Sequence, residues 1–127
     1  MVQINLLIYQ TPVPYTMNRT PLTMAPEILK SENYAFKSDI WSLGIIIYFI
    51  LNKEYPFNGK NEMLLYDDIM TDKKFKLSSN DEKLNDLIIK MLKININERI
   101  SWDDYFNHPF FFNFYNNNII FLNVFDM

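Results

Sequence analysis

The stretch that most constrains the fold is SDIWSLGIIIYFILNK, residues 38–53. Residues 40–51 are apolar apart from one serine and one glycine. Ser38 is a favourable N-cap and Asp39 places a charge beside it, so the pattern predicts a helix that begins at Ser38. A helix that is hydrophobic on every side is expected in the interior, so we expect this one to be the central core helix, buried all round.

A membrane span and a buried strand are the two alternatives for this stretch. Twelve residues of helix span about 18 Å, whereas the hydrocarbon core of a bilayer is about 30 Å thick, so we expect no membrane span. A buried strand is the remaining alternative, because isoleucine, tyrosine and phenylalanine in residues 45–49 favour β structure.

Shorter helical patterns lie on both sides of the central stretch. Residues 25–30 predict a short helix with proline in the first turn, and residues 61–71 predict another with Asn61 as its cap. Along residues 61–71, three apolar side chains fall on one side: Leu65, Ile69 and Met70. The expected fold class is therefore all-α.

The clearest amphipathic pattern covers residues 81–93. Ser79 and Glu82 have the spacing of a capping box at its start. Its apolar stripe follows helical spacing and consists of Leu84, Leu87, Ile88, Met91 and Leu92. A last helix over residues 101–108 is expected to be capped by Ser101 and stopped by Pro109. We interpret its aromatic side chains as core rather than as a ligand platform: Trp102, Tyr105 and Phe106.

Composition excludes several classes of site. The formal charge is −3 and the sequence pI is about 5.0, which gives no basic surface for nucleic acid. There is no cysteine, and His108 is the single histidine, so sulfur-based and multi-histidine metal sites are excluded. We interpret His108 as a helix-end residue. With two glycines, no glycine-rich phosphate loop can form.

The N-terminal residues have an apolar patch but neither a basic region before it nor a small-residue cleavage site. We therefore expect a cytoplasmic protein without a signal peptide. Residues 1–19 are expected to be a poorly patterned arm, residues 20–112 a folded domain, and residues 113–127 a tail rich in asparagine and aromatic residues.

The segments TPLTMAPEIL, DIWSLG, YPF and NERISWDDYFNHPFF, in this order and spacing, resemble the second half of a eukaryotic serine/threonine protein kinase domain. The first and last of them are most similar to the unc-51-like kinases that initiate autophagy and to their protist relatives. These four segments are the landmarks of the resemblance, and the first contains the Ala-Pro-Glu triplet at residues 25–27. The resemblance implies a partial kinase C-lobe over residues 20–112, with the N-lobe absent.

The resemblance assigns roles to individual residues. Thr20, Pro21 and Leu22 match the loop that contacts the substrate residue following the phosphorylated one. Glu27 matches the glutamate of the Ala-Pro-Glu triplet, and Arg99 matches the arginine with which that glutamate pairs. Without the resemblance, each would be interpreted equally well as an ordinary solvated charge.

Two residues of the central stretch also match the family. Asp39 corresponds to the aspartate that holds the backbone of the catalytic loop, and Trp41 to the tryptophan packed under the Ala-Pro-Glu segment. The sequence departs from the family at Arg19, where a glycine is usual. Thr16 is a candidate phosphosite, although any exposed threonine near a proline-rich arm would look similar.

The family transfers a phosphoryl group from ATP with Mg²⁺, using a glycine-rich loop, a strand lysine, an HRD catalytic loop and a DFG aspartate. None of these motifs occurs in the 127 residues. We therefore expect no catalytic residue and no cofactor or metal site in this chain, and no kinase activity from it alone. The expected function is that of a truncated serine/threonine kinase domain.

Two other interpretations stay open. The chain could act as a non-catalytic interaction module, in which a protein partner or self-association covers apolar surface around residues 45–51 that a missing helix would expose. Alternatively, the sequence is an incomplete gene model of an active kinase that continues upstream. Sequencing the transcript would distinguish these cases.

Overall fold

The computed structural model describes residues 21–71 and 75–112. In these residues the regular secondary structure is all helical and there is no strand, so the all-α prediction is confirmed there and the strand alternative for residues 38–53 is wrong. The arm at residues 1–19, together with Thr16, Arg19 and Thr20, and the tail at residues 113–127 lie outside the described residues. The proposed domain boundaries therefore stay predictions.

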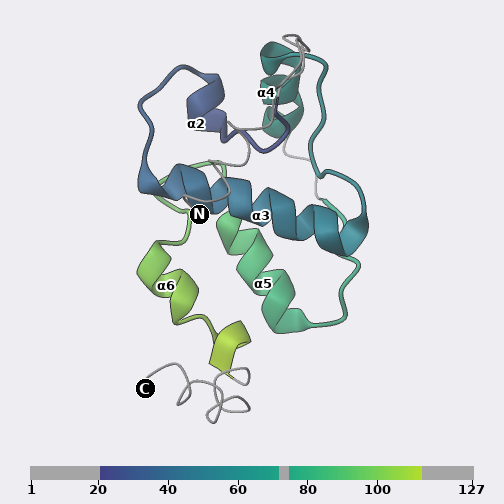
Figure 1. The fold of residues 1–127 in the computed structure, drawn as a ribbon, viewed down its shortest axis with the longest axis vertical. Coiled ribbons are helices and arrows are strands. Elements are labelled where there is room, and N and C mark those ends of the chain that lie inside the picture. The colour runs from purple at the N-terminus through teal and green to yellow at the C-terminus, as the bar shows by residue number, and fades with distance from the viewer. Residues whose placement is uncertain (1–20, 72–74, 113–127) are drawn as a thin grey trace, which may run out of the picture.

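The longest helix, α3 (Phe36–Asn52), crosses the middle of the molecule. Figure 1 shows α2 (Pro26–Leu29) and α4 (Glu62–Met70) on one side of it and α5 (Glu82–Met91) and α6 (Trp102–Phe106) on the other. Among the described helices, none is long and apolar enough to cross a bilayer.

The start of α3 differs from the prediction. The helix begins at Phe36 and its N-cap is Ala35, so Ser38 lies inside the first turn. The hydroxyl of Ser38 accepts a hydrogen bond from the Ala35 backbone N–H at 3.4 Å. The last helical residue is Asn52, and the C-cap Lys53 has a φ of 60°, in the left-handed region. Ser38 therefore closes the helix start from position N3 rather than from the cap position.

Burial of α3 is one-sided, which corrects the expectation that it is buried all round. The buried side chains recur with helical spacing and form a single stripe: Ile40, Trp41, Ile45 and Tyr48. On another side, Ile50 is 66% exposed and Phe49 is also exposed. The described helices leave these two side chains, near the C-terminal end of α3, uncovered.

The predicted caps of α4 and α6 and the predicted apolar side of α4 can be compared with the structure. Asn61 caps α4, because its side-chain oxygen accepts from the Leu64 N–H at 2.8 Å, and Ser101 caps α6 by accepting from the Asp104 N–H at 3.1 Å. Both caps are confirmed. Leu65 and Ile69 are buried under α4, but Met70 is exposed, so its predicted side is wrong.

The cap of α5 is Asp81, not Ser79. The Asp81 carboxylate accepts hydrogen bonds from the N–H groups of Lys83 and Leu84 at 3.0 and 3.2 Å. The hydroxyl of Ser79 instead accepts from the Asp81 N–H. An aspartate at the cap position both satisfies free N–H groups and complements the helix dipole, which explains the shift of two residues.

The C-terminal end of the described chain also departs from the prediction. Helix α6 ends at Phe106, and residues 109–112 form a further helical turn that begins with Pro109. Proline suits the first position of a helix because its missing N–H is not needed there. Phe106 is exposed, whereas Trp102 and Tyr105 are half-buried, so the core assignment fails for Phe106.

The core consists of two clusters that both include residues of α3 and α5. One joins α3 to α2 and α4 and to the loop between α3 and α4, and its buried members include Ala25, Trp41, Phe57, Leu65 and Ile69. The other joins α3 to α5 and contains Ile40, Leu87, Met91 and Ile100. Together they hold α2 and the loop before α6 against the first turns of α3.

Candidate functional site

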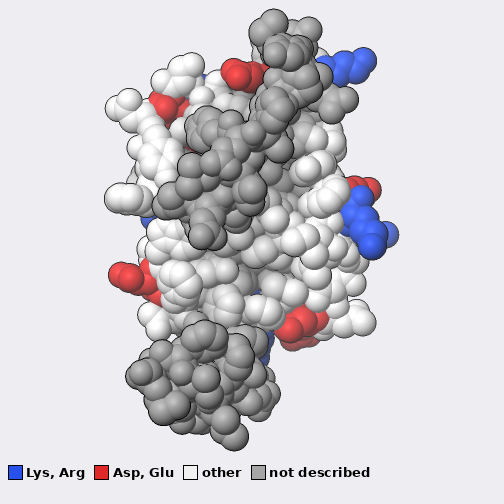
Figure 2. Space-filling view, viewed as in Figure 1, with Lys and Arg blue, Asp and Glu red and all other residues white. Residues whose placement is uncertain are grey.

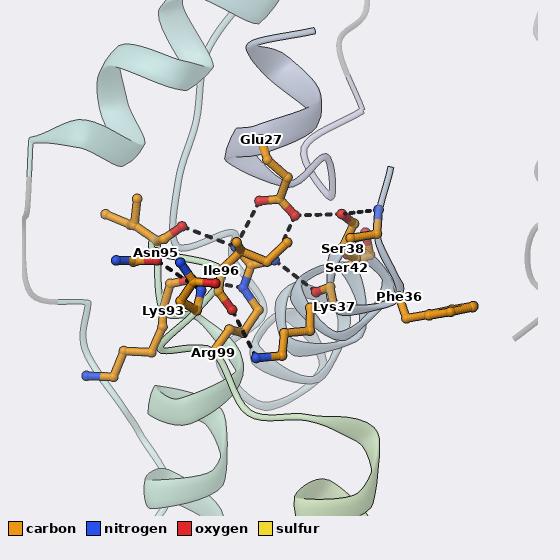
Figure 3. Close-up of polar contacts among 12 residues, drawn as sticks. Glu27, Phe36, Lys37, Ser38, Ser42, Lys93, Asn95, Ile96 and Arg99 are labelled. Atoms are coloured by element: carbon orange, nitrogen blue, oxygen red, sulfur yellow. Dashed lines mark hydrogen bonds and ion pairs between the residues drawn. The ribbon is translucent and has the colours of Figure 1, made fainter. Parts of the chain in front are cut away.

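The most elaborate polar structure of the described residues is an ion pair between Glu27 of α2 and Arg99 of the loop before α6. Nη1 of Arg99 lies 2.8 Å from Oε2 of Glu27, and Nη2 lies 2.9 Å from Oε1. Glu27 is 7% exposed and Arg99 is 1% exposed. The pair is therefore a buried, two-pronged contact between residues far apart in the sequence (Figure 3).

The remaining donors of the guanidinium are used by backbone carbonyls. Nη1 of Arg99 also donates to the Lys37 carbonyl at 2.9 Å, Nε donates to the Lys93 carbonyl at 2.9 Å, and Nη2 donates to the Ile94 carbonyl at 3.3 Å. These contacts and the two to Glu27 use every N–H of the guanidinium. Arg99 thus joins α2, the start of α3 and the loop that follows α5.

The Glu27 carboxylate has a second partner on α3. The hydroxyl of Ser38 donates to Oε2 of Glu27 at 2.6 Å. Burial raises the pKa of Glu27, but the hydrogen bonds from Arg99 and Ser38 outweigh it, so that the pKa lies below its usual value. The carboxylate is therefore held in its charged form.

Trp41 lies beneath this ion pair. The Arg99 guanidinium carbon is 5.1 Å from the centre of the Trp41 ring. The Trp41 ring also stacks with the ring of Phe57, with 5.6 Å between the two ring centres. Trp41 is fully buried and belongs to the same cluster as Ala25. The cation over the aromatic face adds to the stabilisation of the buried arginine.

Asp39 lies one residue after Ser38 and is not part of this network. Its carboxylate accepts a hydrogen bond from the hydroxyl of Tyr34, a residue of the loop before α3. This bond, with smaller effects of burial and of the Asp39 charge, raises the pKa of Tyr34 to about 12. The contact with catalytic-loop backbone that the resemblance implies for Asp39 involves residues absent from this sequence and stays a prediction.

The residues predicted to form the substrate loop, Thr20, Pro21 and Leu22, are described in part. Pro21 is exposed and Leu22 is half-buried against the cluster that contains Trp41. The Met24 N–H donates to the Pro21 carbonyl at 3.1 Å, and the Thr23 carbonyl accepts from the hydroxyl of Ser42 at 2.7 Å. This segment leads directly into α2, and therefore into Glu27.

His108 has a structural role that sequence reasoning did not detect. It is 5% exposed, its Nδ1 accepts from the Phe110 N–H at 3.0 Å, and its Nε2 lies 2.7 Å from the Asp86 carboxylate. Because Nδ1 accepts, Nε2 carries the proton and donates it to Asp86. Lys90 also pairs with Asp86 at 2.8 Å, one helical turn along α5. A lone histidine before a proline gave no signal of this distant partner.

Acidic and histidine side chains are not clustered in the described part of the chain. Within residues 21–71 and 75–112, no group of three or more histidine, aspartate or glutamate side chains is placed to hold a metal ion. A cavity of about 640 Å³ is mainly apolar and is lined by residues that include Phe57, Ile69, Phe75 and Leu92.

Residues 7–111 match the protein kinase domain family. The chain belongs to the protein kinase family. It is 41% identical over 100 residues to the serine/threonine-protein kinase atg1 of Dictyostelium discoideum, covering 75% of this chain and 15% of that protein. It is 36% identical over 100 residues to the serine/threonine-protein kinase unc-51 of Caenorhabditis elegans, covering 75% of this chain and 11% of that protein.

A third relative bears a name of a different kind. The chain is 38% identical over 101 residues to a probable inactive serine/threonine-protein kinase of Dictyostelium discoideum, covering 71% of this chain and 12% of that protein. The chain thus spans between 11 and 15% of the length of these curated kinases. It is a partial serine/threonine protein kinase domain related to the atg1 kinases.

Proposed function

We propose that this chain forms the substrate-loop portion of a serine/threonine kinase C-lobe and does not itself transfer phosphate. The observation that carries the proposal is the buried ion pair of Glu27 and Arg99, which fixes α2 immediately after the loop at residues 20–22. Glu27 then acts as the glutamate of the Ala-Pro-Glu triplet and Arg99 as its partner. Positions 20–22 contact a substrate beside its phosphorylated serine or threonine.

The absence of the family's catalytic motifs from the 127 residues supports the second half of the proposal. Phosphoryl transfer depends on positioned phosphates, Mg²⁺ and a base near the accepting hydroxyl. No glycine-rich loop, HRD or DFG motif is present in this sequence to supply them. ATP-dependent phosphorylation of serine or threonine is the activity we propose for a whole protein that contains these parts.

Substrate contact can be tested by NMR titration of the chain with peptides that contain serine or threonine. We expect amide shifts at residues 22–25 and smaller shifts for matched peptides that contain tyrosine. The variant Met63→Ser, on an exposed side chain of α4, is the control and should titrate like the wild type. Peptides that leave the amide signals of residues 22–25 unchanged would contradict the proposed contact.

The lack of activity is tested with radiolabelled ATP, Mg²⁺ and a generic protein substrate. We expect no phosphate incorporation by the wild-type chain. Incorporation by the wild type that is abolished in Arg99→Ala would overturn this part of the proposal, because the activity would then depend on the folded domain rather than on a contaminant.

A non-catalytic interaction role is the second candidate, and exposed apolar side chains favour it. Met63 and Leu64 are exposed on α4, and Phe49 and Ile50 are exposed on α3. On the face drawn in Figure 2, charged side chains of both signs lie around the margins and leave a broad uncharged area. A monodisperse monomer at micromolar concentration that melts cooperatively would count against this role.

A further inference from the structure

Ser42 of α3 makes a contact that its helix does not require. A serine inside a helix usually directs its hydroxyl to the carbonyl four residues earlier, which here belongs to Ser38. That carbonyl is 3.3 Å from Oγ of Ser42, whereas the Thr23 carbonyl is 2.7 Å away. Since a hydroxyl has a single proton, the shorter contact shows that it is donated mainly to Thr23, outside the helix.

The contact of Ser42 is one of two that join the same segments. Ser38, one turn earlier on α3, donates to Glu27 at 2.6 Å. Ser42 therefore meets Thr23 while Ser38 meets Glu27, which means that residues 23–27 and residues 38–42 run in opposite directions beside each other. Two hydroxyls on one face of α3 thus hold both ends of a five-residue segment.

The two contacts differ in what they hold. Ser38 adds to a carboxylate that Arg99 already grips with two hydrogen bonds. Ser42 holds a backbone carbonyl at the end of the turn in which the Met24 N–H donates to the Pro21 carbonyl at 3.1 Å. A single hydrogen bond from α3 therefore bears directly on the conformation of residues 21–24.

We propose that Ser42 is a positioning residue that sets the conformation of the substrate loop at residues 21–24 against α3. Its hydroxyl locks the Thr23 carbonyl, which fixes the turn that presents Pro21 and Leu22. The proposal rests on the substrate-loop function given above. It differs from the Glu27–Arg99 pair, which fixes α2 after the loop rather than the loop itself.

The experiment compares amide hydrogen exchange in the wild type, Ser42→Ala, Ser42→Thr and Ser78→Ala. Ser78 is a matched control, because its hydroxyl donates to the Leu51 carbonyl at 3.2 Å near the other end of α3. Loss of the Ser42 hydroxyl should speed exchange at the Met24 amide by about tenfold, the change expected for one lost hydrogen bond. Ser42→Thr should restore protection, and Ser78→Ala should leave Met24 unchanged.

Three results would overturn the proposal: unchanged exchange at Met24 in Ser42→Ala, no recovery in Ser42→Thr, or an equal increase at all amides of the core. If Ser42→Ala does not fold, Ser42→Cys replaces it, because a thiol is nearly the same size and a much weaker donor. The same predictions then apply to Met24.

Peptide titration of the same variants separates this proposal from the proposed function. If the loop binds substrate, Ser42→Ala should bind a serine-containing peptide several-fold more weakly, and Ser42→Thr should bind it like the wild type. Equal binding by all variants would contradict positioning by Ser42. If the wild type binds no peptide while Met24 still loses protection in Ser42→Ala, the substrate role falls and the anchoring of the loop stands.

Discussion

Arg99 is the residue on which the local structure depends most, because its guanidinium is buried and all its contacts are internal. Its partners lie in α2, at the start of α3 and in the loop after α5. A buried charge is tolerated when it is paired and hydrogen-bonded, and it becomes costly when one partner is removed. The ion pair is therefore a sensitive point of the fold.

We expect Arg99→Ala to lower the free energy of unfolding by about 3–5 kcal/mol, because Glu27 would remain buried without a counter-charge. Urea denaturation followed by circular dichroism measures the change. The control is Lys90→Ala, which removes a half-exposed partner of Asp86 and should cost less than about 1 kcal/mol. Equal losses of unfolding free energy in Arg99→Ala and Lys90→Ala would contradict the conclusion that the buried ion pair is a sensitive point of the fold.

The charge of Glu27 makes stability depend on pH. Its pKa is lowered in the folded state, so its contribution is fully present above the usual value of 4.5 and is lost as the pH falls through the lower, folded-state pKa. Unfolding measured between pH 7 and pH 3 should show this loss, and Glu27→Gln should reduce it. Part of the slope should persist, because hydrogen bonds from Lys90 and His108 also lower the pKa of Asp86.

Tyr34 gives a separate test of the contact made by Asp39. With the Asp39 carboxylate as its acceptor, Tyr34 should ionise at a pKa of about 12. In Asp39→Asn its pKa should fall toward the ordinary tyrosine value of about 10, because the acceptor loses its charge. NMR titration resolves Tyr34 from the other tyrosines, and an unchanged pKa in the variant would show that the contact does not form.

At the scale of the elements, α3 lies close to the end of α5 at Gly44. A Cβ added at this position would lie 2.9 Å from Cδ2 of Leu92 and 3.0 Å from Cβ of Met91. The first neighbour is the end of a flexible side chain, whereas the second is attached directly to the α5 backbone. Glycine in the middle of this helix is therefore explained by packing rather than by a need for flexibility.

We expect Gly44→Ala to be destabilising by up to about 2 kcal/mol, because overpacking costs about 1–3 kcal/mol and alanine recovers about 1 kcal/mol of helix propensity. Thermal unfolding measures the net effect. In the double variant Gly44→Ala/Leu92→Val, the smaller valine should relieve part of the overpacking. The loss of stability should then be smaller than the sum of the losses in the two single variants. A more stable Gly44→Ala protein would show that α5 can move away at little cost.

At the scale of the whole molecule, the one-sided burial of α3 is the feature with most consequence. Ile50 and Phe49 are exposed on a helix whose opposite side is fully buried. Beside them lies an apolar cavity of about 280 Å³ whose lining includes Ile47, Leu84 and Phe110. Exposed apolar surface of this kind favours association or a partner.

We expect Ile50→Lys to reduce concentration-dependent self-association while leaving the free energy of unfolding within about 0.5 kcal/mol of the wild type, as is usual for exposed positions. Analytical ultracentrifugation at several concentrations measures the association. Met63→Lys on α4 is the matched control for an added positive charge. If both variants or neither changed the association, the exposed side of α3 would not be the surface responsible.

The positions of the helices could be predicted from the sequence because caps and apolar periodicity are local signals. Asn61 and Ser101 show this directly, since each cap bonds a group only three residues away. The start of α3 was misplaced because Ser38 has the residue type of a cap but serves Glu27, a partner eleven residues earlier. Local patterns carry no information about such partners.

The sequence by itself determined the all-α class, the order of the helices and, through its landmarks, membership of the kinase family. Only the tertiary structure decided that Ser42 bonds the Thr23 carbonyl, that His108 binds Asp86 and that α3 is buried on one side. The physical reason is that apolar periodicity and capping act within one or two turns. The contacts that build the site depend on which segments pack together, as for Glu27 and Arg99, 72 residues apart.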